Sequence, residues 1–123
     1  MDKILIIQDS PSINALLKVR IESAGFFVET AESGEDGIKK AEEAQFQVIL
    51  LDYTLPGKDG AEVCRILKSQ GHTKDIPVVF MSAKDEDQIQ NIVTTCGAQD
   101  YICLPLKGKA LVEKLKYLIK KEL

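Results

Sequence analysis

Apolar residues follow two alternating patterns along this chain. Short apolar runs, typical of strands that are buried on both faces of a parallel sheet, alternate with longer stretches in which apolar residues recur every three or four positions, as on one face of a helix. The strands are predicted at residues 4–7, 26–30, 48–51, 76–81 and 101–103. A helical stretch follows each of them, so the chain reads as consecutive βα units.

Helix start and stop signals support this division. Ser10 followed by Pro11 predicts the start of the first helix, and Gly25 predicts its left-handed end. Ser33 predicts the cap of the second helix, and Gly97 the end of the fourth. The positions expected to face the core are Ile13, Leu16, Leu17, Ile21 and Ala24 in the first helix, Ile38 and Ala41 in the second, Val63, Cys64, Ile66 and Leu67 in the third, Ile89, Ile92, Val93 and Cys96 in the fourth, and Leu111, Leu115, Leu118 and Ile119 in the last. The lysines of the last helix, at positions 109, 114, 116, 120 and 121, are expected to form a solvated face.

Few topologies accommodate such a chain without a long linker or repeat. Right-handed crossovers with helices on both faces predict an α/β fold with a doubly wound five-stranded parallel sheet, in the strand order 2-1-3-4-5. The length of 123 residues, with 45% hydrophobic and 28% charged residues, fits one globular domain, residues 1–123.

Composition excludes several function classes. The net charge of −3, without a basic block, argues against a nucleic-acid surface on this domain. Cys64, Cys96 and Cys103 have no metal-ligand spacing and lie in apolar runs, which predicts buried reduced thiols and a cytoplasmic protein. We find neither a signal-peptide pattern nor an apolar run long enough to span a membrane, so no membrane contact is expected.

The first candidate for chemistry is Asp52, which directly follows the buried run 48–51. Open α/β sheets bind ligands at the carboxyl ends of their strands, and in the predicted order Asp9 and Asp52 converge there, with Ser82 arriving from the next strand. Two carboxylates and a loop carbonyl would suit Mg²⁺, and a carboxylate beside a cation can attack phosphorus. The alternative is that Asp52 only accepts hydrogen bonds from its own loop.

Four motifs together resemble the receiver domain of two-component response regulators, a flavodoxin-like (βα)5 fold. They are Asp9, the block at residues 52–60, the pair Ser82-Ala83 and the segment at residues 97–102, and the resemblance covers the whole chain. It implies that Asp52 accepts a phosphoryl group from a histidine kinase or phosphotransfer protein. The domain would then be no enzyme in the usual sense, since it would catalyse at most its own phosphorylation and dephosphorylation.

The resemblance also implies roles for other residues. Asp9, Asp52 and the backbone carbonyl of Thr54 would bind Mg²⁺. Ser82 would be the switch hydroxyl and Tyr101 the switch aromatic, which reports phosphorylation to a downstream protein or output domain on the surface of the fourth helix, fifth strand and fifth helix.

Two positions depart from the family pattern. Gln8 stands where the family usually has a second acid, so the site loses one negative charge and Mg²⁺ is expected to bind weakly. Leu104 stands where a lysine usually precedes the proline, here Pro105. The candidates to replace this lysine are Lys58, Lys84 and Lys107.

Three functions follow from these observations. A phosphorylation-dependent switch is the prediction, and the departures at Gln8 and Leu104 motivate the alternative of a pseudo-receiver, an interaction module with weak or no phosphorylation. A phosphatase of the haloacid-dehalogenase type would need a second acid two residues after Asp52, where Thr54 stands.

Overall fold

The computed structural model describes residues 2–53, 55, 59–82, 90, 91, 93, 96–103 and 108–122. The helices and strands are β1 (Lys3–Ile7), α1 (Pro11–Glu22), β2 (Phe27–Ala31), α2 (Gly34–Glu43), β3 (Val48–Asp52), α3 (Gly60–Ser69), β4 (Val78–Ser82), β5 (Asp100–Cys103) and α5 (Gly108–Glu122). The label α4 is kept for the predicted fourth helix, which lies largely outside the described residues.

The strands form one parallel sheet in the order β2-β1-β3-β4-β5, which confirms the predicted topology. Its register aligns the strand ends. Ile7 is level with Leu51 on β3, and Asp52 is level with Met81 on β4. The carboxyl ends of β1, β3 and β4 therefore meet along one edge.

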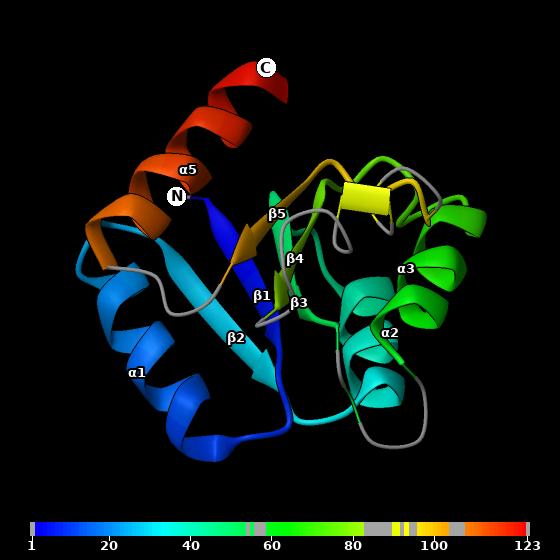
Figure 1. Ribbon diagram of the computed structural model, residues 1–123, viewed down its shortest axis with the longest axis horizontal. Helices are drawn as coiled ribbons and strands as arrows, with labels where there is room; N and C mark the ends of the chain where they lie inside the picture. The colour runs from blue at the N-terminus through cyan, green and yellow to red at the C-terminus, as the bar shows by residue number, and fades with distance from the viewer. Residues whose placement is uncertain are drawn as a thin grey trace.

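Helices cover both faces of the sheet, with α1 and α5 on one side and α2 and α3 on the other (Figure 1). Alternate residues of the strands point to opposite faces, so β1 contributes Leu5 to one apolar cluster and Ile4 to the other. We call these the α2–α3 cluster and the α1–α5 cluster. All of residues 48–51 are fully buried, as the unbroken apolar run predicted.

The predicted caps are present. Ser10 Oγ accepts a hydrogen bond from Ile13 N at 3.3 Å, and Ser33 Oγ accepts one from Asp36 N at 3.1 Å. Gly25, after α1, has φ of 98°, a left-handed conformation that glycine adopts without strain. The side chains of Ser10 and Ser33 satisfy amide groups that a helix leaves unpaired at its start, which explains why α1 and α2 begin where the sequence indicated.

The predicted core face of α1 is partly wrong. Ile21 is buried, but Ile13 is 41% and Leu16 is 55% exposed, and the polar Asn14 is buried in their place. Successive residues of a helix are rotated by about 100° around its axis. Residues 14 and 21 therefore share the side that faces the sheet, whereas Leu16 lies on the opposite side. Much of the apolar character of α1 therefore faces solvent.

Several strand boundaries, by one or two residues each, and one lysine also differ from expectation. β2 and β4 begin one and two residues later than predicted, at Phe27 and Val78. Before β4, Pro77 has no amide hydrogen, although its carbonyl accepts a hydrogen bond from Ile49 N at 2.9 Å. Lys114 is not part of a solvated lysine face, because it pairs with Asp100 on β5. In the part of the chain that the structure describes, none of the helices has the length and apolar character needed to cross a membrane.

Candidate functional site

Asp52 is the last residue of the central strand β3, where the buried apolar run ends and the side chain becomes partly exposed. On the neighbouring strand, Ser82 occupies the last position of β4 and is 4% exposed. The register places Ser82 one residue beyond the level of Asp52. The structure therefore brings these two predicted site residues to neighbouring strand ends.

The loop after β1 presents Asp9 to solvent and holds Gln8 inside. Gln8 is 3% exposed, and its Oε1 accepts a hydrogen bond from Ser10 N at 3.2 Å. Its backbone carbonyl accepts a second one from Asn14 Nδ2 at 2.7 Å. Gln8 thus braces the loop that carries Asp9 onto the start of α1. The sequence pattern did not predict this brace, because Asn14 was not among the positions of α1 expected to face the core.

A close backbone contact supports Asp52 from the other side. Gly60, the first residue of α3, donates a hydrogen bond to Tyr53 O at 2.7 Å. A Cβ atom on Gly60 would lie 2.6 Å from Tyr53 Cα and 2.7 Å from Asp52 O, inside the contact distance of real side chains. Only glycine lets α3 begin this close to Asp52. The sequence indicated a turn here but not this contact.

Tyr53 links the site to the middle of the sheet. Its ring makes an edge-to-face contact with Phe80, with 5.8 Å between the centroids and 80° between the planes. Phe80 is level with Tyr101 on β5, and Tyr101 is half-buried. The predicted switch aromatic therefore lies two strands away from Asp52.

Several residues that were named from the sequence lie outside the described part of the chain, among them Thr54, Lys58, Lys84, Leu104 and Lys107. Their contributions to the site stay predictions.

The donor set fits a hard cation with few protein ligands. Asp9 and Asp52 supply carboxylates near the ends of the adjacent strands β1 and β3. The side-chain oxygen of Gln8, in contrast, already accepts a hydrogen bond from Ser10 N. The described residues contain no group of three or more His, Cys, Asp or Glu side chains that could hold a metal. Mg²⁺ commonly uses one or two carboxylates and keeps several waters, so these residues are compatible with it.

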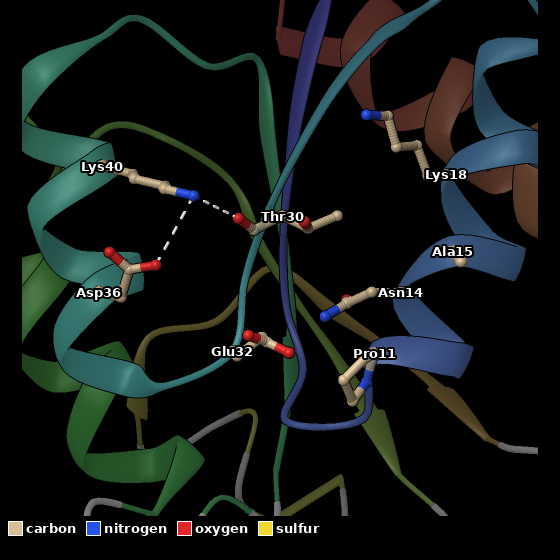
Figure 2. Close-up of a pocket in the computed structure, with 8 residues that line it drawn as sticks. All are labelled: Pro11, Asn14, Ala15, Lys18, Thr30, Glu32, Asp36 and Lys40. Carbon is tan, nitrogen blue, oxygen red and sulfur yellow. Dashed lines mark hydrogen bonds and ion pairs between the residues drawn. The ribbon is translucent and has the colours of Figure 1, made fainter.

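A separate cavity of about 430 Å³ lies between α1, the end of β2 and α2. Figure 2 shows its charged lining: Lys40 donates a hydrogen bond to Thr30 O and lies 3.6 Å from Asp36 Oδ2, while Lys18 and Glu32 lie on other walls. Asp9, Asp52 and Ser82 do not line this cavity. It is therefore distinct from the predicted site.

Cys64 and Cys96 behave as the sequence predicted. Cys64 and Cys96 are free and buried, and Cys64 Sγ contacts Cys96 O at 3.3 Å. Burial, with the neighbouring Cys96 adding to it, raises the pKa of the Cys64 thiol to about 11, and burial also raises the pKa of Cys96. A thiol that stays protonated is a poor nucleophile and metal ligand, so these side chains serve packing.

Comparison with known proteins decides the family. The profile of the family described as the response regulator receiver domain matches residues 4–116. The chain belongs to this family. The match confirms the resemblance seen in the motifs and covers both halves of the sheet.

Related sequences agree with this assignment of the receiver domain. It is 33% identical over 121 residues to the transcriptional regulatory protein AfsQ1 of Streptomyces coelicolor, with 98% of this chain and 52% of AfsQ1 covered. It is 35% identical over 119 residues to the alkaline phosphatase synthesis transcriptional regulatory protein PhoP of Bacillus subtilis, with 97% of this chain and 49% of PhoP covered. The receiver domain thus spans about half the length of these relatives.

Solved structures share its fold. The chemotaxis protein CheY4 of Vibrio cholerae superimposes with a TM-score of 0.91 at 27% identity, covering 96% of this chain and 98% of that one. The receiver domain of a signal transduction histidine kinase from Syntrophus aciditrophicus gives 0.89 at 29% identity, with coverages of 98% and 92%. Receiver domains are phosphoacceptors that interact with histidine kinases and output domains, so the family assignment favours the phosphorylation-dependent switch over the pseudo-receiver.

Proposed function

We propose that residues 1–123 form one receiver domain that accepts a phosphoryl group on Asp52. The observation that carries this proposal is the position of Asp52. It is the partly exposed acid that ends the central strand, between the strand that ends in the buried Ser82 and the strand whose following loop presents Asp9. The backbone contact with Gly60 holds Asp52 in place, as a nucleophile in a displacement reaction requires.

The proposed reaction is transfer from a phosphohistidine of a histidine kinase or phosphotransfer protein. A carboxylate oxygen of Asp52 attacks phosphorus, the phosphorus–nitrogen bond breaks, and the electron pair returns to the imidazole, which takes up a proton. The product is an aspartyl phosphate on Asp52. The donor is proposed to dock on the exposed apolar side chains of α1, Ile13, Leu16 and Val19, because a patch of this kind beside a site marks a partner surface.

Asp9, Asp52 and the backbone carbonyl of Thr54 are proposed to hold Mg²⁺. When bound, the cation neutralises charge on the transferring phosphoryl group. A neutral amide at Gln8 leaves the site with one acid fewer than the family pattern, so binding is proposed to be weak. The side chains of Asp9 and Asp52 bind and orient; Gln8 and Asn14 hold the loop on which Asp9 lies.

For output, Ser82 is proposed as the switch hydroxyl and Tyr101 as the switch aromatic. The matched relatives named above are transcriptional regulators of about twice this length, so the downstream partner is proposed to be an output domain or separate protein contacting the surface of α4, β5 and α5. The receiver itself is proposed to contact neither nucleic acid nor membrane. The protein is proposed to act in the cytoplasm, a proposal that its free buried thiols support because they suit a reducing compartment.

Intact-protein mass spectrometry after incubation with acetyl phosphate, with and without Mg²⁺, tests the central step. The wild type is expected to gain one base-labile phosphoryl group that depends on Mg²⁺. Asp52→Asn should abolish the gain, whereas Asp59→Asn, at an exposed helix cap nearby, should retain it. If neither acetyl phosphate nor a range of histidine kinases modifies the wild type, the pseudo-receiver takes its place.

A further inference from the structure

A cluster of three residues joins α5 to the edge strand β5. Lys114 Nζ lies 3.2 Å from Asp100 Oδ1 and donates a hydrogen bond to Tyr101 O at 2.8 Å. The same ammonium lies 5.5 Å from the centroid of the Tyr101 ring. One cation therefore contacts the carboxylate, the main chain and the aromatic face at the start of β5.

Two of these three contacts do not depend on where the ring points. Asp100 Oδ1 is held in place because it also accepts a hydrogen bond from Tyr101 N at 2.8 Å. The other anchor is a main-chain carbonyl of a strand that is paired with β4. Rotation of the Tyr101 side chain about its Cα–Cβ bond would move the ring and leave both anchors unchanged. Two contacts that do not depend on the orientation of the ring therefore hold the ammonium of Lys114 beside it.

The ring also ends a row of aromatic side chains. Tyr53 and Tyr101 both pack against the α2–α3 cluster, which contains Phe80. Phe80 contacts Tyr53 edge-to-face and is level with Tyr101 on the adjacent strand. The row begins at the residue after Asp52, crosses the sheet and ends at Lys114. The residue after Asp52 and the ring beside Lys114 therefore pack against the same apolar cluster.

We propose that Lys114 is a positioning residue that holds the Tyr101 ring in its resting conformation and so sets how often the receiver adopts the alternative one. This rests on the switch role proposed above for Tyr101. The negative face of an aromatic ring attracts a cation, so a ring that turns away from Lys114 loses this attraction. For a partly exposed pair the loss corresponds to roughly a two- to five-fold change in the ratio of ring positions.

The test is an NMR measurement of the Tyr101 rotamer populations in unphosphorylated protein labelled at its tyrosines. The chain has three tyrosines, so Tyr53→Phe and Tyr117→Phe assign the signals. Lys114→Gln, which retains the length and loses the charge, should shift the Tyr101 populations by about two- to five-fold. Lys114→Arg, which keeps the positive charge, should have the Tyr101 populations of the wild type. Lys116→Gln, at an exposed position of the same helix, should also leave these populations unchanged.

Equal Tyr101 populations in the wild type and in folded Lys114→Gln would overturn the proposal. So would a shift that Lys114→Arg fails to reverse, because a purely structural loss would not depend on charge. Since the measurement needs no phosphorylation, its outcome is separate from that of the acetyl phosphate experiment.

Discussion

Gly60→Ala should destabilise the protein, although alanine normally stabilises a helix relative to glycine. The added Cβ would lie 2.6 Å from Tyr53 Cα, 2.7 Å from Asp52 O and 2.8 Å from Tyr53 O. Ordinary contacts between such atoms are about 3.5 Å or longer, so α3 and the Asp52 segment must separate by close to 1 Å. Overpacking of this kind costs about 1–3 kcal/mol, which outweighs the roughly 1 kcal/mol gained in helix propensity.

The matched control is Gly71→Ala. A Cβ at Gly71 would meet nothing within 4 Å, so this substitution should be neutral or should stabilise by about 0.4–1 kcal/mol through the unfolded chain. Urea unfolding of both variants measures the difference. Because the separation displaces Asp52, phosphorylation of Gly60→Ala by acetyl phosphate should also slow by ten-fold or more, on the order expected for a 1 Å misplacement. Equal stability of the two variants, with a wild-type phosphorylation rate for Gly60→Ala, would refute the reasoning.

Three further predictions concern charge and capping. Gln8→Asp should strengthen Mg²⁺ binding by on the order of 1 kcal/mol or more, since it adds a negative charge beside the carboxylates. A Mg²⁺ titration that shows no gain in affinity would mean that residue 8 does not face the cation. The raised pKa of Cys64 means that the unfolded chain loses this proton first, so the free energy of unfolding should fall between pH 9 and about 11, by roughly 2–3 kcal/mol at most. Unfolding of Cys64→Ala across this range should show a shallower fall, and an identical slope would contradict the assignment. Asp59 Oδ1 accepts a hydrogen bond from Glu62 N at 2.8 Å, so Asp59→Ala should lower the free energy of unfolding in urea by about 1 kcal/mol. Asp59→Asn can still cap the helix and should lose less; an equal loss in both variants would contradict the prediction.

The strand order followed from the sequence because each step had a local signal. The unbroken run at residues 48–51 indicated a strand covered on both faces, and Ser10 and Ser33 marked the helices that provide the cover. The handedness of βα connections then left little choice. Local signals and chain geometry were sufficient for the positions of Asp52 and Ser82 at the ends of their strands.

Contacts between distant elements were beyond such reasoning. The apolar residues of α1 suggested a core stripe that includes Leu16, yet the orientation of the helix on the sheet turns Leu16 outward and Asn14 inward. Lys114 looked like any other lysine of α5, because its pairing with Asp100 depends on how close α5 lies to β5. The approach of Gly60 to Asp52 likewise depends on the final packing of α3.

The division of the core between the two faces bears on how the chain folds as it emerges from a ribosome. The α2–α3 cluster draws most of its side chains from the first two thirds of the chain, from Leu5 to Phe80. The α1–α5 cluster instead combines Ile4 and Ile6 of β1 with Leu111 and Leu115 of α5, so it is complete only after α5 has been synthesised. During synthesis, one face of β1 can be covered while the other stays exposed to water and to other chains. The C-terminal helix is therefore the segment whose late arrival, or loss by truncation, would leave the nascent protein most prone to aggregate.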